Sequence, residues 1–374
     1  MTNESLANQE SGSRWDYKLW KTCIASRRFE PQTLLSVFVR GATVELVCPA
    51  GNLPSLKAAV DNGADSVYIG FRDATNARHF AGLNFSDKQV AAGIAYAHDR
   101  SAKVFVAINT YPRPDNLEEW FSAVDKAAMA GVDALILADI GVMDYAAERW
   151  PDLNLHLSVQ GSATSQEAIR FYAEQFGSKR AVLPRVLSVK QVAAVAGASP
   201  VPIEVFGFGS LCVMVEGRCF LSSYVTGLGP NLFGACSPGR FVEWRDTDKG
   251  METRLNGMLI DRVGGDEHAG YPTVCKGRYA VNGRTGYAIE EPTSLNTLPI
   301  LSELHDIGVA AIKIEGRQRS PAYVATVTSI FREAIDACLA DPDAFQPEPA
   351  WTDSLAALSE GTQVTLGAYN RGWQ

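Results

Sequence analysis

The segment Gly63-Ala-Asp-Ser-Val-Tyr-Ile69 recurs twice in similar form, as Gly131-Val-Asp-Ala-Leu-Ile-Leu137 and as Gly308-Val-Ala-Ala-Ile-Lys-Ile314. In each copy the glycine suits the left-handed conformation that ends many helices, and a short apolar run follows at once. Each copy therefore predicts a junction at which a helix ends and a buried strand begins. The recurrence indicates a chain of 374 residues built from strand–helix units.

Apolar runs of strand length occur at eight places along the chain, and helical patterns separate most of them. The runs lie at residues 44–47, 66–71, 104–108, 134–138, 155–159, 180–184, 203–208 and 308–314. They are nearly continuous in apolar residues, as in parallel strands covered on both faces. Apolar residues at three- and four-residue spacing predict helices at 53–62, 87–99, 117–130, 165–176 and 188–196. This alternation predicts an α/β fold, most economically a (β/α)8-type barrel.

A doubly wound open sheet is the alternative architecture. The chain has no G-x-G-x-x-G after the first predicted strand, which argues against the usual dinucleotide site.

The strand–helix rhythm stops between the seventh and eighth predicted strands. We expect a barrel domain at 43–341 that includes a loop-rich, cysteine-containing insertion late in the chain, at 204–280. Residues 1–42 are polar and irregular, which predicts a poorly ordered N-terminal extension. Residues 342–374 are expected to form a C-terminal tail.

The composition restricts the class of protein. Hydrophobic residues make up 46% of the chain and charged residues 20%, which is ordinary for a globular protein with a sizeable core. The formal net charge of −8 argues against stable binding of nucleic acid. No apolar run approaches the roughly 18 residues of a membrane span, and residues 1–42 make a poor secretory signal. Seven cysteines without an export signal then predict a cytoplasmic protein whose thiols bind metal or react.

Four of the cysteines, Cys212, Cys219, Cys236 and Cys275, lie in the insertion, separated by six, sixteen and thirty-eight residues rich in Gly, Ser and Pro. Structural zinc sites usually contain cysteine pairs two to four residues apart, and no gap here is that short. Four thiolates also suit an iron–sulfur cluster, which a folded scaffold can bind through widely spaced cysteines. These spacings favour iron–sulfur and leave zinc, or four unrelated thiols, open. Cys48 and Cys338 are expected in the core.

Several polar residues follow the predicted strands, at the end of a barrel where active sites lie. Arginines that converge there favour a substrate with carboxylates or phosphates, although each residue could instead satisfy the backbone of its own loop. The candidate substrate-binding residues are Arg78, Asn109, Gln160, Arg185, Glu315 and Arg317. The sequence nominates no catalytic residue.

Two motifs carry a family resemblance. Glu204-Val-Phe-Gly-Phe-Gly-Ser-Leu-Cys212 and Gly217-Arg-Cys219-Phe-Leu-Ser222 resemble the signature of the collagenase-like peptidase family of unassigned mechanism. Gly234-Ala-Cys-Ser-Pro-Gly-Arg-Phe241 and Ala269-Gly-Tyr-Pro-Thr-Val-Cys-Lys-Gly-Arg278 are most similar to the family members that act in ubiquinone biosynthesis. The resemblance runs from about Val44 to the C-terminus.

The resemblance implies a 4Fe–4S cluster bound by the four cysteines of the insertion. It also implies a heterodimer with a related barrel protein of the UbiV type. Together the two chains would hydroxylate the ring precursor of ubiquinone without oxygen, with prephenate as the hydroxyl donor. An RNA-base hydroxylase of the same family, or a non-catalytic accessory subunit with a structural cluster, are the alternatives.

Peptidase activity is not expected from the residues present. The chain has five histidines, His79, His98, His156, His268 and His305, and none lies in H-E-x-x-H or beside an obvious nucleophile motif.

Overall fold

The computed structural model describes residues 43–371 except positions 79, 81, 266, 268 and 362. These residues belong to one compact unit, Arg40–Gln374. The predicted N-terminal extension and Cys23 lie outside the described residues, as do His79 and His268.

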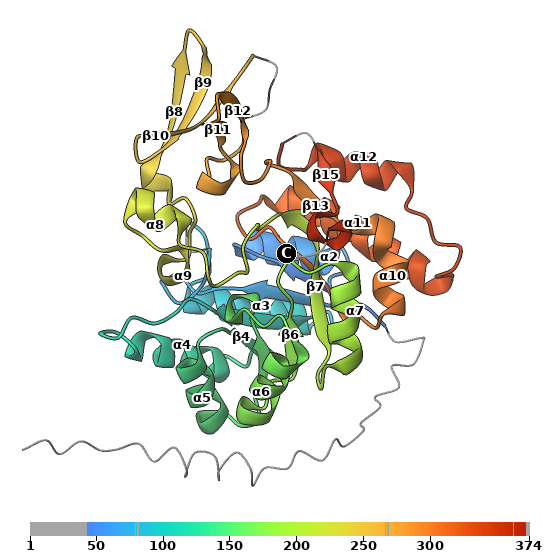
Figure 1. Ribbon diagram of the computed structural model, residues 1–374. Helices are drawn as coiled ribbons and strands as arrows, with labels where there is room; N and C mark the ends of the chain where they lie inside the picture. The colour runs from blue at the N-terminus through green and yellow to red at the C-terminus, as the bar shows by residue number, and fades with distance from the viewer. Residues whose placement is uncertain are drawn as a thin grey trace, which may run out of the picture. The chain divides into compact units, whose positions relative to one another are not determined.

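Eight parallel strands close into a barrel (Figure 1). They are β1 (Glu45–Pro49), β2 (Ser66–Ile69), β3 (Lys103–Ile108), β4 (Ala134–Leu137), β5 (Asn154–Leu157), β6 (Arg180–Val182), β7 (Ile203–Ser210) and β14 (Ala311–Ile314). Each strand pairs with the next, and β14 pairs with both β7 and β1, so the sheet has no break. The predicted barrel and its eight strands are confirmed, and the open-sheet alternative is excluded.

Helices follow the strands and pack on the outside of the barrel. They are α2 (Leu53–Asp61), α3 (Asp87–His98), α4 (Glu118–Met129), α5 (Ile140–Arg149), α6 (Gln166–Phe176), α7 (Val189–Ala198), α10 (Leu301–Asp306) and α11 (Pro321–Ala340). The five predicted helices are confirmed, whereas α5, α10 and α11 were not among the predicted ranges. At the quoted junctions Gly63, Gly131 and Gly308 have φ of 93°, 80° and 82°, the conformation that glycine adopts without strain.

Side chains alternate between the inside and the outside of the barrel. On β1, Leu46 and Cys48 join the main core under the helices, while Val47 belongs to a second apolar cluster with Tyr68 and Phe105. Cys48 and Cys338 are both buried in the main core, as predicted.

A buried ionic network lies among the barrel strands. Glu204 on β7 accepts Lys313 Nζ at 2.7 Å and Arg180 Nη1 at 3.2 Å. Arg180 also pairs with Glu45, so two carboxylates balance two cations. His156 on β5 lies edge-on to the ring of Phe105, with 4.9 Å between ring centroids.

His156 makes the protein sensitive to acid. Burial, aided by the charge of Arg180, lowers its pKa to about 3. The native histidine therefore stays neutral while the unfolded one takes up a proton below about pH 6.5, so stability falls as the pH falls through this interval. We expect the free energy of unfolding to drop by about 1.4 kcal/mol per pH unit below pH 6 from this residue alone.

Urea unfolding of the wild type and of His156→Gln, between about pH 7.5 and about pH 5, measures this loss. This interval lies above the range in which most carboxylates titrate. Equal slopes for the two proteins would contradict the prediction.

The insertion between β7 and β14 contains more regular structure than its composition predicts. Helices α8 (Leu221–Thr226) and α9 (Pro230–Phe233) and the 3₁₀ turn η2 (Gly239–Phe241) come first. A three-stranded antiparallel sheet follows, formed by β8 (Val242–Thr247), β9 (Gly250–Leu255) and β10 (Met258–Val263). The turn η3 (Val274–Lys276) then leads into a hairpin of β11 (Arg278–Val281) and β12 (Arg284–Tyr287). The segment outside the barrel thus continues beyond residue 280.

The chain returns to the barrel through β13 (Ser294–Asn296), which pairs antiparallel with the end of β7. The turn η4 (Leu298–Ile300) then leads into α10. In the C-terminal tail, α12 (Pro349–Ala357) precedes β15 (Val364–Thr365), which pairs parallel with β13. A last turn, η5 (Gly367–Asn370), places the Tyr369 hydroxyl 3.1 Å from the carbonyl oxygen of Phe206 on β7. The described part of the tail therefore packs against the end of β7, beside the insertion.

Candidate functional site

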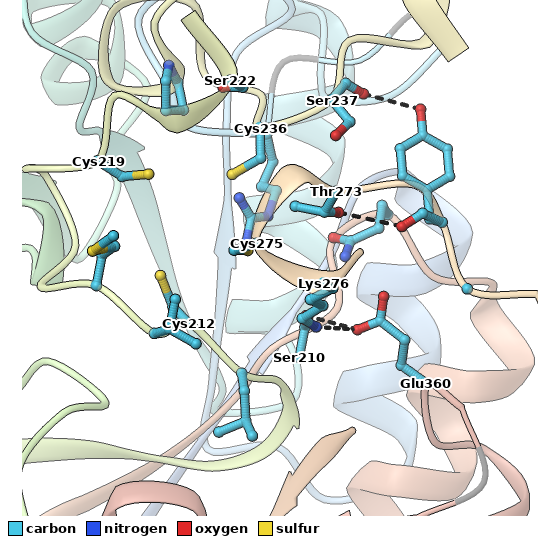
Figure 2. Close-up of a pocket in the computed structure, with 18 of the residues that line it drawn as sticks. Ser210, Cys212, Cys219, Ser222, Cys236, Ser237, Thr273, Cys275, Lys276 and Glu360 are labelled. Atoms are coloured by element: carbon cyan, nitrogen blue, oxygen red, sulfur yellow. Dashed lines mark hydrogen bonds and ion pairs between the residues drawn. The ribbon is translucent and has the colours of Figure 1, made fainter. Parts of the chain in front are cut away.

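The four cysteines of the insertion line one cavity of about 840 Å³. Figure 2 shows the side chains of Cys219 and Cys236 pointing toward one another, with Cys212 directed into the same space. All four are partly exposed and none forms a disulfide. Segments up to 63 residues apart in sequence therefore meet around one space, as a shared ligand would require.

Loops that follow the barrel strands hold the insertion in place. Gly234 lies two residues before Cys236, and its carbonyl oxygen accepts a hydrogen bond from the amide of Arg78 at 2.7 Å. A Cβ at Gly234, where φ is 76°, would lie 2.6 Å from the carbonyl oxygen of Asn76. Only glycine fits this position without a shift of the loop, because it lacks a Cβ and tolerates positive φ. The second anchor is Asn231, whose carbonyl oxygen accepts the amide of Tyr111 after β3 at 3.0 Å and whose Nδ2 donates to the carbonyl oxygen of Cys219 at 3.0 Å.

A third anchor lies beside β5. Ser162 Oγ donates to the carbonyl oxygen of Glu216 at 2.5 Å. The next residue, Gly217, has φ of 89°, and a Cβ there would overlap the carbonyl oxygen of Gln160. The same carbonyl oxygen accepts the hydroxyl of Tyr111 at 2.6 Å. The loops after β2, β3 and β5 thus fix the insertion close to two of its cysteines, Cys219 and Cys236.

Burial keeps the thiols of Cys212 and Cys275 protonated in the absence of a ligand. It raises the pKa of Cys212 to about 12, with a further contribution from Glu216. It also raises the pKa of Cys275 to about 12, where Cys236 and Cys219 add to the effect. The thiols are therefore close enough to influence one another's charge. A metal that binds them as thiolates must displace their protons.

No three described side chains of the His, Cys, Asp and Glu types are close enough together to hold a single metal ion. The four sulfurs thus share a cavity without converging on one point.

The six predicted substrate-binding residues come together at the mouth of the barrel. Arg78, Asn109, Gln160, Arg185, Glu315 and Arg317 all line a small cavity of about 70 Å³. Three of them, Arg78, Gln160 and Arg185, also line the cysteine cavity, so the two spaces adjoin. The structure places the residues together, and their role as ligands remains a prediction.

Ion pairs neutralise two of the three arginines. Arg185 Nε donates to Glu216 at 2.7 Å, and Arg78 Nε lies 3.4 Å from Glu315. Burial opposes the charge of Arg185, but its acidic neighbours, Glu216 foremost and Glu315 among them, together raise the pKa of the guanidinium. Burial likewise opposes the charge of Glu315, but Arg78 and Arg185 lower the pKa of this carboxyl group. Each of these groups is therefore charged and largely paired.

Arg317 differs because it has no carboxylate partner among the described residues. Its side chain is buried, and Nη1 donates to Asn76 Oδ1 at 3.0 Å. Burial lowers its pKa to about 10, so the group is still cationic at neutral pH. A guanidinium has five N–H donors, and the part of the chain that the structure describes gives Arg317 this one acceptor. Arg317 is the mouth residue best able to bind an anion.

Gln160 and Asn109 differ in whether their side-chain amide groups are free to bind a ligand. Asn109 uses both ends of its amide, accepting the amide of Ala77 at 2.9 Å and donating to Ser158 Oγ at 3.1 Å. Gln160 Oε1 is buried and has no hydrogen-bond donor among the described residues. A hydroxyl group on a ligand would satisfy it, because a buried acceptor without a partner is costly. Asn109 instead fixes the loops that surround the mouth.

Sequence reasoning did not nominate Ser210, Lys276 or Glu360, which also line the cysteine cavity. Lys276 follows Cys275 directly, so its position beside a candidate ligand was visible in the sequence. Its partner Glu360 is 84 residues away, and nothing local indicates that contact.

The three described histidines lie away from both cavities. His156 is inside the barrel, His98 Nε2 lies 2.9 Å from Asp133 Oδ2 on the outer surface, and His305 is near the end of α10. None of the three is placed to activate a cysteine of the insertion.

Comparison with known proteins places the chain in a family. Residues 51–370 match the model of Peptidase family U32. The chain belongs to this family. No described helix of this U32 protein is both long and apolar enough to cross a membrane.

Relatives of this U32 protein have different names. An uncharacterized protease of Methanocaldococcus jannaschii is 36% identical, over 79% of this chain and 66% of that protein. The tRNA hydroxylation protein P1 of Bacillus subtilis is 31% identical, over 86% of this chain and 71% of that protein. The 23S rRNA 5-hydroxycytidine C2501 synthase of Escherichia coli is 30% identical, over 79% of this chain and 40% of that protein. The U32 chain described here thus spans only part of the length of each relative.

Proposed function

We propose that this chain is an iron–sulfur subunit for oxygen-independent hydroxylation of the ring precursor of ubiquinone, the role of a UbiU-like protein. It would act in the cytoplasm with a UbiV-like barrel protein and take its hydroxyl group from prephenate. The observation that carries the proposal is that one cavity is lined both by the four cysteines and by Arg78, Gln160 and Arg185 at the barrel mouth. Relatives named as hydroxylation proteins support the type of reaction.

The donor set suits a 4Fe–4S cluster. Each of the four thiolates in such a cluster binds a different iron, so the sulfurs need not converge on one point. A zinc ion instead requires all of its ligands at about 2.3 Å from a single centre. Four thiols around a cavity, none in a disulfide, match the first arrangement more closely. When bound, the cluster would supply or accept single electrons.

The mouth residues suit an anionic donor that carries a hydroxyl group. Arg317 offers N–H groups to a carboxylate, as a charge-assisted hydrogen bond. Gln160 Oε1 offers an acceptor to a hydroxyl group. Arg317 and Gln160 Oε1 are both buried, which strengthens both interactions. Prephenate has carboxylates and a hydroxyl group, and it fits this pattern.

The larger cavity suits a ring substrate better than a nucleic acid. Its wall includes Phe80, Leu211, Met214, Val274 and Ala356. Three of its four cations, Arg78, Arg185 and Lys276, are each paired with a carboxylate of this chain, and the fourth is Arg319. A nucleic-acid site needs cations that are available to phosphates. The pairing, together with the net charge of −8, favours the quinone precursor.

RNA-base hydroxylation is the second candidate function, because relatives are named as tRNA and rRNA hydroxylation proteins. A deletion strain grown without oxygen separates the two. We expect it to accumulate under-hydroxylated quinone precursors and to keep its hydroxylated nucleosides. Loss of a hydroxylated nucleoside with normal quinone would instead support the RNA function.

Two variants connect the phenotype to the site. Arg317→Met should fail to restore quinone synthesis in the deletion strain, because it removes the cation at the barrel mouth that has no carboxylate partner among the described residues. Arg72→Met, on an exposed side chain after β2, should restore it. Anaerobic co-purification with the partner then tests whether this chain binds iron, sulfide and the quinone precursor. Full activity of Arg317→Met would count against the assignment of the mouth.

A further inference from the structure

Lys276 is enclosed where three distant segments meet. Its Nζ donates to Glu360 Oε2 at 2.6 Å and to Ser210 Oγ at 3.0 Å. Ser210 Oγ donates to the same carboxylate oxygen at 2.9 Å. The side chains of Lys276 and Glu360 are only 5% and 14% exposed. Figure 2 shows the three side chains in contact beside the cavity. We call this group the clasp.

The clasp joins the two ends of the cysteine segment. Ser210 is two residues before Cys212, and Lys276 is the residue after Cys275. The first and the last of the four cysteines are therefore fixed through one carboxylate. That carboxylate belongs to the C-terminal tail, outside the insertion.

Contacts outside the clasp hold the backbone at Glu360 in place. Its amide donates to Ser294 Oγ at 2.8 Å, and Ser294 on β13 pairs with both Ser210 and Val364. The next residue, Gly361, has φ of 71°, and a Cβ there would overlap the carbonyl oxygen of Pro292. The tail thus passes close to β13 only because this residue is glycine. The same small sheet positions both Ser210 and Glu360.

We propose that Glu360 is a positioning residue that closes the cysteine segment and holds Cys212 and Cys275 at the separation that a metal centre needs. The identity of that centre rests on the proposed function, whereas the closure depends only on the contacts of the clasp. Removing one partner of a buried ion pair leaves the other charge uncompensated. Without Glu360, the ammonium group of Lys276 must move to water and carry the backbone of Cys275 with it.

Thiol accessibility in the metal-free, reduced full-length chain tests the closure. In Glu360→Gln we expect alkylation of Cys212 and Cys275 by iodoacetamide, read residue by residue by mass spectrometry, to accelerate about tenfold. Cys48 and Cys338 in the core should keep their wild-type rates. Asp353→Asn is the matched control, because it removes an exposed carboxylate from the same tail.

Two results would overturn the proposal. One is Glu360→Gln with the alkylation pattern of Asp353→Asn. The other is equal acceleration at Cys48 and Cys338, which would mean that the whole protein has loosened instead of one segment.

A double variant tests the ion pair itself. Lys276→Met also breaks the clasp, but Lys276→Met with Glu360→Gln removes both charges and leaves none uncompensated. The double variant should therefore expose Cys212 and Cys275 less than either single variant does. Additive effects of the two substitutions would show that the charges are not coupled and would contradict the proposal.

Iron measurements separate this proposal from the proposed function. After anaerobic reconstitution with ferrous iron and sulfide, Glu360→Gln should bind less iron per chain than Asp353→Asn. If the wild-type chain binds no iron, the proposed iron–sulfur function is wrong. The accelerated alkylation of Glu360→Gln would still support the clasp in that case.

Discussion

Replacing Cys275 with alanine is expected to abolish iron binding, whereas Cys338→Ala should retain it. Cys275 lies in η3 and its side chain lines the cavity shared with Cys212, Cys219 and Cys236. A 4Fe–4S cluster uses four cysteine ligands, so the loss of one leaves an iron of the cluster without its protein ligand. Iron should fall from about four per chain to less than about one.

Anaerobic purification followed by iron and sulfide analysis and visible absorption measures this difference. Cys338 is the matched control because it is a cysteine buried in α11, far in sequence from the insertion and absent from both cavity walls. Zinc without iron in the wild type, with no charge-transfer absorption, would contradict the iron–sulfur assignment. Iron retained by Cys275→Ala would exclude this residue from the ligand set.

The fold could be predicted because its pattern is local. A glycine with positive φ followed by an apolar run marks each helix-to-strand junction, and the structure has this geometry at Gly63, Gly131 and Gly308. Helix α5 was missed although Asp139 caps it by accepting the amide of Val142 at 3.0 Å. Ala138 and Asp139 are the two residues between β4 and α5, which is too short a linker to indicate where the strand ends and the helix begins.

The small sheets of the insertion could not be predicted in the same way. All residues of β8 are at least partly exposed, and three of its six residues are charged, namely Glu243, Arg245 and Asp246. A strand without a buried face lacks the apolar alternation by which strands are recognised. Its pairing with β9 is visible only in the folded chain.

The candidate site could be predicted in its residues but not in its arrangement. The six mouth residues follow from one rule, that barrel sites lie after the strands, and the structure brings them together. The rule cannot say that Arg78 and Arg185 are neutralised while Arg317 is not, because Glu315 and Glu216 come from other parts of the chain. The same limit applies to Glu360, whose contact with Lys276 spans 84 residues.

Glu204→Ala is expected to destabilise the protein more than any surface substitution, by about 3–5 kcal/mol. Glu204 opens the motif that leads to Cys212, but its side chain is 1% exposed and points to Lys313 and Arg180 among the barrel strands. The substitution leaves Lys313 without its counter-ion at a fully buried position. Burial already lowers the pKa of Lys313 while Glu204 opposes the shift, so removal of Glu204 should lower this pKa further.

Urea unfolding at neutral pH measures the loss, and Glu243→Ala is its control. Glu243 also pairs with an arginine, Arg245 at 2.9 Å, but its side chain is 49% exposed. An exposed pair contributes about 0–1 kcal/mol, so this control should remain close to the wild type. If Glu204→Ala and Glu243→Ala unfold at the same urea concentration, the buried network does not stabilise the barrel.

Adding Lys313→Met to Glu204→Ala separates the lost attraction from the uncompensated charge. If the ammonium group is the main cost, the double variant should recover part of the stability, because an apolar side chain replaces a buried cation. The recovery should be incomplete, since Glu45 is then the one carboxylate partner that Arg180 keeps among the described residues. A double variant less stable than Glu204→Ala would show instead that Lys313 stabilises the barrel independently of Glu204, through its position 4.0 Å from the ring centroid of Tyr68.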